Sequence, residues 1–388
     1  METKMKVVPL ETKMKIVTMS ALGLMLSGSL ALAGGFELQT IDTSAMYENG
    51  GFASFSTAKL NSKLYGVGAN GQKVKTLKDQ SFSSISLKAD VGSVSLGIAT
   101  YRSGAIQMSG GSDGTFAGSY APSVNANLDT TAFMARYALG ENYGLLGGVK
   151  QNSLGSFNLT SIYGSYDINS ANNSSSVLGA YYSIPEIALR AEVLLQPASK
   201  ITTTGTYTSA LLTIPGVLNL PAGIPGSVAA TVKLPEMLTI NFQTGIAKDT
   251  LLTASIHQAK WGSSQVTANV TSGNAGVDAA AAVTSAFSDT TKYSVGLGRK
   301  FSERLSGSIA YSQEDGSGST STSAFSMSNG SKAISAGIKY SLENMDISFG
   351  ISHTMFNDMT VKVNALTPNL SYKNNSATTM GFKISTRF

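Results

Sequence analysis

The segment "SISLKADVGSVSLGIAT" (residues 84–100) contains two strands and the turn between them, and its pattern recurs through most of the chain. In the first half, Ile85, Leu87 and Ala89 alternate with Ser86 and Lys88, and the second half repeats the alternation after "DVG". A period of two indicates strands with one apolar and one polar face. Segments of about ten such residues are typical of transmembrane β-barrels, whose apolar face contacts lipid.

The same pattern predicts fourteen strands, connected alternately by short turns and long connections. The expected strands cover residues 51–60, 81–90, 92–102, 126–139, 142–157, 175–184, 187–203, 233–246, 250–265, 291–301, 304–314, 331–341, 344–362 and 377–388. Short periplasmic turns and long outer loops alternate in this way in outer-membrane barrels. The predicted fold class is therefore all-β, an antiparallel up-and-down barrel over residues 51–388.

Composition excludes several classes of protein. Only 13% of the 388 residues are charged, 42% are hydrophobic, and there is no cysteine. Soluble domains carry about a quarter charged residues. We found no clustered basic patch of the kind that binds phosphates, so we expect no nucleic-acid partner. His257 and His353 lie inside predicted strands, and the sequence shows neither an acidic partner for them nor a G-x-S-x-G elbow. We therefore expect that the protein is not an enzyme, has no catalytic residue and binds no metal or cofactor.

Residues 1–33 are predicted to be a signal peptide. Lys4, Lys6, Lys13 and Lys15 precede the apolar run "IVTMSALGLMLSGSLALA", which ends in a small-x-small cleavage site before Gly34. The alternative is an N-terminal membrane anchor. No second apolar run of about 18 residues follows, so the expected location is the outer membrane of a Gram-negative bacterium rather than a helical span. Residues 34–50 are left as a short plug before the first strand.

Strand parity also predicts what lines the barrel interior. The inward charged residues are expected to be Lys88, Arg136, Lys150, Arg190, Glu192, Lys339, Lys383 and Arg387. They are either ordinary water-exposed wall residues, or basic partners for an anionic head group. For the second role we name Lys150, with Arg136 and Arg190.

An apolar stretch without charge, "SALLTIPGVLNLPAGIPGSVAA" (209–230), lies in the connection expected over residues 204–232. Proline and glycine interrupt it too often for one continuous strand or helix. An exposed apolar surface of this kind usually marks a binding site. The residues expected to capture a hydrophobic ligand are Leu211, Leu212, Ile214, Val217, Leu218, Leu220 and Ile224. The alternative is a lid over the barrel mouth with its own small core.

Several segments resemble the FadL/TodX family of outer-membrane transporters for hydrophobic compounds. "KLPEMLTINFQTGIAKDTLLTASIHQAKW", "VLGAYYSIPEIALRAEV" and "KYSVGLGRKFSERLSGSIAYS" are similar to hairpins of that family, and the resemblance covers most of residues 175–388. "GGFELQT", with Phe36 as the expected plug residue, and "YENGGFASFS" extend it weakly to the first half.

The resemblance implies a fourteen-stranded barrel with an N-terminal hatch. It further implies passive transport of hydrophobic or amphipathic molecules such as long-chain fatty acids, which leave sideways beside a kinked strand near the N-terminus. The chain departs from the family pattern because only about seventeen residues, 34–50, precede the first strand, and they lack the Asn-Pro-Ala motif. We place Glu236 of the matched L-P-E-M at the start of a strand rather than in a ligand site.

The expected partners are a hydrophobic small molecule, outer-membrane lipid and lipopolysaccharide, and the barrel-assembly machinery, which would recognise the terminal Phe388. We expect a monomer. Two alternative functions remain open at this point: a general diffusion porin for hydrophilic solutes, and a structural or adhesive surface barrel.

Overall fold

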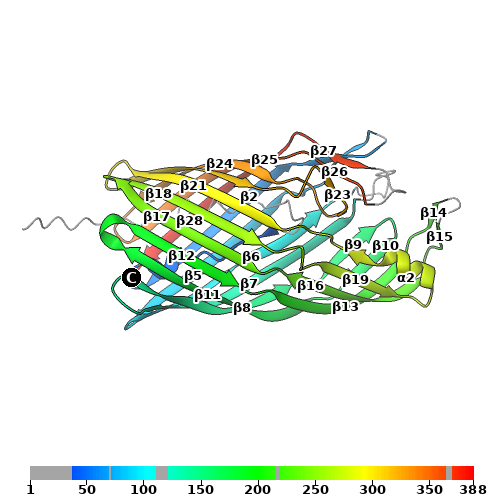
Figure 1. The fold of residues 1–388 in the computed structure, drawn as a ribbon, viewed down its shortest axis with the longest axis horizontal. Coiled ribbons are helices and arrows are strands. Elements are labelled where there is room, and N and C mark those ends of the chain that lie inside the picture. The colour runs from blue at the N-terminus through cyan, green and yellow to red at the C-terminus, as the bar shows by residue number, and fades with distance from the viewer. Residues whose placement is uncertain (1–36, 70, 111–120, 215–217, 364–368) are drawn as a thin grey trace, which may run out of the picture.

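Fourteen antiparallel strands close into a barrel in the computed structural model, which describes residues 37–69, 71–110, 121–214, 218–363 and 369–388 (Figure 1). The predicted fold class and strand number are thus confirmed. The barrel strands are β2 (Phe52–Lys63), β5 (Gln80–Val91), β6 (Val94–Met108), β7 (Ser123–Ala138), β8 (Tyr143–Leu154), β11 (Ala171–Ile184), β12 (Leu189–Gln196), β17 (Met237–Ala247), β18 (Thr250–Ala259), β21 (Thr290–Lys300), β22 (Leu305–Glu314), β24 (Ser331–Ser341), β25 (Met345–Phe356) and β28 (Asn375–Arg387).

The barrel closes where its first strand, β2, pairs with its last, β28. Phe55 lies opposite Ile384 in this pair, and Gly51 and Phe388 exchange backbone hydrogen bonds of 2.8 and 3.0 Å just beyond it. Closure leaves no unpaired edge in the wall at this seam. Short turns, one of which contains the 3-10 helix η2 (Pro185–Ile187), gather at the end of the barrel where the chain terminates, and the long connections gather at the other end (Figure 1). We call these the turn end and the loop end.

The alternation in the sequence decides which side chains face out. Leu87, Val149 and Ile338 are exposed on the outer face, whereas Lys88, Lys150 and Lys339, each the next residue along, are buried on the inner face. The predicted inward set follows this parity throughout: Lys88, Lys150, Glu192, Lys339 and Lys383 are buried, and Arg136, Arg190 and Arg387 are half-buried.

Two predicted strands each break into two at a proline. The expected strand 187–203 is β12 followed by β13 (Ser199–Ser209), with Pro197 between them. The expected strand 233–246 is β16 (Pro225–Leu234) followed by β17, with Pro235 between them. Proline has no N–H to donate to a neighbouring strand. Beyond the two prolines the strands change neighbours: β12 pairs with β11, but β13 pairs with β10.

Much of the long connections is β-structure rather than irregular loop. One group extends the sheet beyond the barrel at the loop end, and it consists of β9 (Phe157–Ser161), β10 (Gly164–Ile168), β13, β16, β19 (Val266–Thr271) and β20 (Val283–Thr284). A small separate sheet contains β3 (Tyr65–Val67), β4 (Lys73–Lys75), β23 (Thr320–Ser321), β26 (Met359–Val361) and β27 (Leu370–Tyr372). Between β19 and β20 lies α2 (Ala275–Ala281), whose first turn is capped by the Asn274 side chain. No helix of the described residues is both long and apolar enough to cross a membrane.

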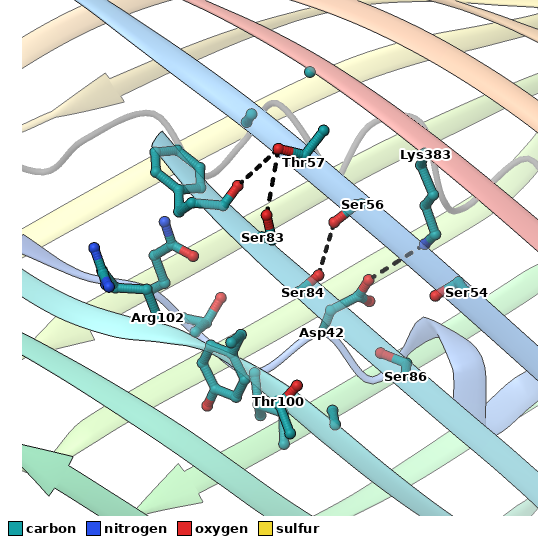
Figure 2. Close-up of a pocket in the computed structure, with 18 of the residues that line it drawn as sticks. Asp42, Ser54, Ser56, Thr57, Ser83, Ser84, Ser86, Thr100, Arg102 and Lys383 are labelled. Carbon is teal, nitrogen blue, oxygen red and sulfur yellow. Dashed lines mark hydrogen bonds and ion pairs between the residues drawn. The ribbon is translucent and has the colours of Figure 1, made fainter. Parts of the chain in front are cut away.

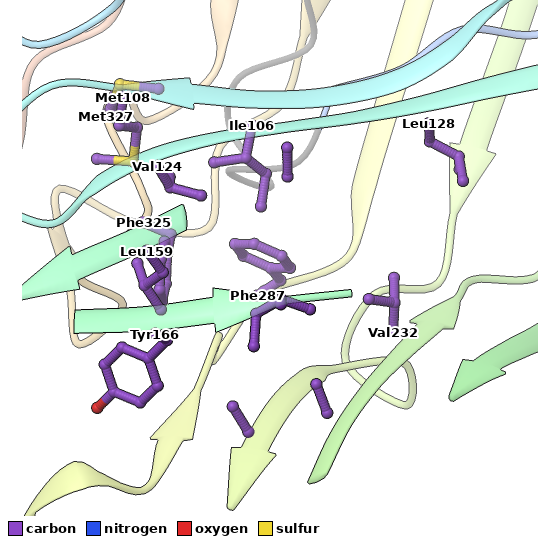
Figure 3. Packing of buried hydrophobic residues seen from close by; sticks show 14 of the residues in the cluster. Ile106, Met108, Val124, Leu128, Leu159, Tyr166, Val232, Phe287, Phe325 and Met327 are labelled. Atoms are coloured by element: carbon purple, nitrogen blue, oxygen red, sulfur yellow. The ribbon is translucent and has the colours of Figure 1, made fainter. Parts of the chain in front are cut away.

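An apolar core fills the interior of the loop end (Figure 3). Barrel strands contribute inward side chains such as Ile106 and Leu128, and the connections contribute Phe287, Phe325 and Met327. Each fully buried large apolar side chain stabilises such a core by about 1.5–3 kcal/mol. The long connections are therefore packed across the mouth of the barrel.

Candidate functional site

The N-terminal segment 37–50 lies against the inner face of the barrel wall. It contains β1 (Glu37–Leu38) and the 3-10 helix η1 (Ser44–Tyr47). Ile41 and Met46 are buried in a second apolar cluster, which the wall completes with Ala132, Met134, Leu146, Val177 and Leu194. Apolar packing therefore holds the middle of the segment to the wall.

Glu192 of β12 joins this segment to the wall by hydrogen bonds. Thr43 Oγ1 lies 2.8 Å from one carboxylate oxygen of Glu192 and 3.0 Å from the other, and the Tyr47 hydroxyl donates at 2.6 Å. Asn241 of β17 donates at 2.9 Å from the wall itself. Glu192 is only 2% exposed, and a buried carboxylate is costly unless its oxygens are hydrogen-bonded. These donors meet that requirement.

Two arginines complete the surroundings of this anchor. The Arg190 guanidinium lies 4.1 Å from the centre of the Tyr47 ring, and that of Arg136 lies 5.1 Å from the same ring and 5.4 Å from the ring of Tyr181. Tyr47 and Tyr181 themselves meet edge to face at 5.4 Å. Arg136 and Arg190 thus converge on the ring of Tyr47, where each cation is attracted to the aromatic face.

Charged contacts fix the segment at the turn end. Lys88 Nζ donates to the backbone oxygens of Glu48 and Gly50 at 2.6 and 2.9 Å. Arg387 forms ion pairs of 2.8 Å with Glu48 and 3.1 Å with Asp346. The inward charges near the turn end therefore hold the N-terminal segment in place.

The wall has a gap between β5 and β6. The two strands pair from Val91–Val94 to Ile85–Thr100, and β6 then continues without β5. On that side it pairs instead with β1, where Leu38 lies opposite Gly104. A register shift between Arg102 and Gly104 marks a β-bulge in β6. Bulges bend the strand that carries them, which accounts for the separation from β5.

The gap ends near the loop end. Lys78 N donates to the Gln107 oxygen at 3.3 Å, and an isolated bridge joins Leu77 to Met108. The opening therefore lies between residues 80–84 of β5 and residues 101–106 of β6, and the N-terminal segment occupies part of it.

A cavity of about 140 Å³ lies at this gap (Figure 2). Its lining comes from residues 39–43 of the N-terminal segment and from β2, β5, β6, β17 and β28. The hydroxyls of Ser56 and Ser84 lie 2.7 Å apart on adjacent strands, and Lys383 forms an ion pair of 3.8 Å with Asp42. The lining is rich in hydroxyl side chains: Thr40, Thr43, Ser54, Ser56, Thr57, Ser83, Ser84, Ser86, Thr100 and Tyr101.

The residues predicted to bind an anionic head group do not form one cluster. Lys150 is only 6% exposed, and its ammonium donates to Gln196 Oε1 at 2.5 Å. It lines a small cavity of about 20 Å³ together with Leu38 and Asn152. Arg136 and Arg190 instead surround Tyr47. The head-group role of all three residues stays a prediction.

The predicted capture residues lie on or beside the hairpin of β14 (Leu212–Ile214) and β15 (Leu218–Leu220). Some of them are exposed and others are packed against the protein. Leu211 is 70% exposed, whereas Leu220 is 1% exposed and belongs to the loop-end core. Leu212 and Ile224 are half-buried against that core. Val217, the plug residue Phe36 and the side chains of Ile214 and Leu218 lie outside what the structure describes. The capture role therefore also stays a prediction.

Glu236 and the histidines occupy ordinary positions. Glu236 lies between β16 and β17 and forms an exposed ion pair of 2.5 Å with Lys260. His257 and His353 lie beside threonine hydroxyls on the neighbouring strands, with their Nδ1 atoms 3.0 Å from Thr239 and 3.2 Å from Thr378. These contacts are those of wall residues.

Sequence reasoning missed the serines of the cavity. Ser54 and Ser56 in "FASFSTAKL", and Ser84 and Ser86 in "SFSSISLK", are the polar half of the alternation. Parity alone places them inside the barrel, as it does many other serines. What distinguishes them is the gap beside them, which depends on where β6 leaves β5.

No protein-family model matches the chain, and no curated protein is similar to it in sequence. Solved structures are similar to it along nearly its whole length. A FadL homologue of Pseudomonas aeruginosa superposes with a TM-score of 0.70 at 12% identity, over 95% of this chain and 98% of that one. The chain has the fold of these transporters.

Two further structures agree with this. The toluene transporter TodX of Pseudomonas putida gives a TM-score of 0.67 at 12% identity, over 94% of this chain and 99% of that one. The monoaromatic hydrocarbon channel CymD gives 0.60 at 12% identity, over 90% and 94%. The resemblance drawn from the sequence is confirmed at the level of the fold.

Proposed function

We propose that the protein is a passive transporter for hydrophobic or amphipathic small molecules, such as long-chain fatty acids, in the outer membrane of a Gram-negative bacterium. The observation that carries the proposal is the interior of the barrel. Its loop end is filled by apolar side chains, and a cavity of about 140 Å³ adjoins a gap in the wall. Porins instead keep a polar, water-filled channel.

The orientation follows from the general architecture of outer-membrane barrels. Short turns face the periplasm and long connections face outward. The loop-end core and the β14–β15 hairpin would then meet the external medium first. Phe388 is exposed at the turn end, a position that suits recognition by the barrel-assembly machinery. The exposed apolar outer face would contact lipid and, at the outer rim, lipopolysaccharide. In this proposal the protein is a monomer, so lipid surrounds the barrel on all sides.

The path that we propose has three stages. Leu211 and its neighbours on the β14–β15 hairpin capture the hydrophobic molecule. It then passes through the loop-end core toward the middle of the barrel. On this path Lys150 would contact an anionic head group first, and Arg136 and Arg190 would contact it nearer the turn end. It leaves through the gap between β5 and β6, because the N-terminal segment and its ion pairs at Glu48 obstruct the direct route to the turn end.

Uptake and conductance measured on the same preparation test this proposal. Cells that express the protein should accumulate dodecanoate faster than cells that express an unrelated barrel. The purified protein in a planar bilayer should pass little steady ion current, because its interior is filled. Large steady currents without any gain in dodecanoate uptake would instead identify a diffusion porin. If the protein assembles normally but shows neither dodecanoate uptake nor a steady ion current, a structural or adhesive role is the remaining explanation.

A further inference from the structure

The cavity at the wall gap has many hydroxyl groups in its lining, whereas the interior of the loop end is apolar. Ser54 lies opposite Ser86, and Ser56 lies opposite Ser84, across the β2–β5 pair. All four line the cavity. The buried Tyr101 hydroxyl at the same wall has no hydrogen-bond partner in the described part of the chain.

Part of this lining is apolar, including Ile41 and Phe82, but a bare hydrocarbon could not hydrogen-bond the hydroxyl groups beside them. Polar groups that lose water to an apolar ligand lose hydrogen bonds without replacement. Sites built to hydrogen-bond a ligand therefore discriminate strongly against analogues that lack the polar group. The charges nearby are already paired, Lys383 with Asp42 in the cavity and Arg102 with Asp129 at its outer side.

The position of the gap on the outer face also favours a ligand that carries a polar group. On β5 the outward residues are apolar from Val91 to Ile85 and then become serine at Ser83. On β6 the change falls between Ile98 and Thr100. The gap opens just beyond the Ile85–Thr100 pair, where the apolar outer band ends. A second hollow of about 240 Å³ on the outer side is lined by polar residues that include Thr100, Arg102 and Asp129.

We propose that this cavity binds the polar head group of an amphiphile, a hydroxyl or carboxyl group on an apolar chain, and that such molecules are transported in preference to bare hydrocarbons. The inference rests on the proposed transport function and specifies its substrate class. The serine hydroxyls hydrogen-bond the head group at the level where the membrane surface becomes polar. The apolar chain can then enter the adjacent lipid.

The test compares dodecanol, dodecanoate and dodecane, which share one chain length and differ in the head group. The double variant Ser56→Ala/Ser84→Ala removes the central hydroxyl pair of the cavity. It should lower uptake of dodecanol and dodecanoate about two- to tenfold, the effect of losing ordinary hydrogen bonds, and leave dodecane uptake unchanged. Loss confined to dodecanoate would show that the site selects charge and would overturn the hydroxyl part of the proposal.

The matched control is Ser335→Ala/Ser352→Ala. These hydroxyls form a similar inward pair, 2.9 Å apart on β24 and β25, outside the cavity lining. The control should take up all three compounds as the wild type does. If the Ser56/Ser84 variant lowers uptake of all three compounds equally, or of none, the head-group site is refuted while the transport function stands. Failure of the wild type to take up any of them would refute the transport function itself.

Discussion

The Tyr47 hydroxyl donates a 2.6 Å hydrogen bond to Glu192 and so ties the N-terminal segment to a wall strand 145 residues later. The same carboxylate accepts hydrogen bonds from Thr43 of the segment and Asn241 of the wall. One buried wall residue thus carries a large share of the polar contacts that position the segment.

Glu192→Ala should release the N-terminal segment from the wall. Thr43 and Tyr47 would lose a charged acceptor, and Arg136 and Arg190 would lose a nearby opposite charge. We expect the segment to dock more weakly by about 2–4 kcal/mol. Proteolysis within residues 37–50 should become faster, and ion conductance in planar bilayers should rise. Glu186→Ala, at the exposed turn of η2, is the control and should change neither.

Lys150→Met should reduce uptake of dodecanoate about tenfold and leave dodecane uptake unchanged, if its ammonium contacts a carboxylate head group. The neighbouring Gln151→Met is the matched control, because Gln151 faces the outer side of the same strand. Equal uptake of dodecanoate by the two variants would show that Lys150 is an ordinary wall residue.

Leu211→Ser and Leu220→Ser separate capture from packing at the β14–β15 hairpin. Leu211 is exposed, so its replacement should slow uptake without changing thermal stability, if the hairpin captures the ligand. Leu220 is buried, so its replacement should destabilise the loop-end core by about 2–4 kcal/mol. If only Leu220→Ser affects uptake, the hairpin is a packed lid and not a capture surface.

Docking of the N-terminal segment should weaken in acid. Partial desolvation inside the barrel works against the charge on Asp42, but Lys383 and hydrogen bonds from Ser44 outweigh it and hold the pKa of Asp42 below its usual value. A group with a lowered pKa stabilises the docked state above its unfolded-state pKa, and this contribution is lost as the pH falls through the folded-state pKa. Proteolysis of the segment should therefore accelerate below about pH 4.

Asp42→Asn provides the comparison for this pH dependence. The amide cannot ionise, so the variant should be cut faster than the wild type at neutral pH and should show a smaller change on acidification. An identical pH profile in the two proteins would show that Asp42 does not control the pH dependence of docking.

The alternation of residues such as Leu87 and Lys88 was sufficient to predict the barrel, its fourteen strands and the inward position of the charged side chains. Parity is a local property of the chain, because successive side chains point to opposite faces of a strand. The same reasoning could not show that the long connections fold into further strands. Short segments such as β9 and β10 are stable only because they pair with each other and with longer strands, β9 with β7 and β10 with β13.

The sequence by itself therefore determined the fold, the polarity of its two faces and the family that it resembles. Only the tertiary structure decided where the functional features lie. The Glu192 anchor joins residues far apart in the chain, the gap exists because β6 exchanges β5 for β1, and the serines become a cavity lining only beside that gap. Each depends on which strands become neighbours, and pairing between distant segments is set by the closure of the whole barrel rather than by local pattern.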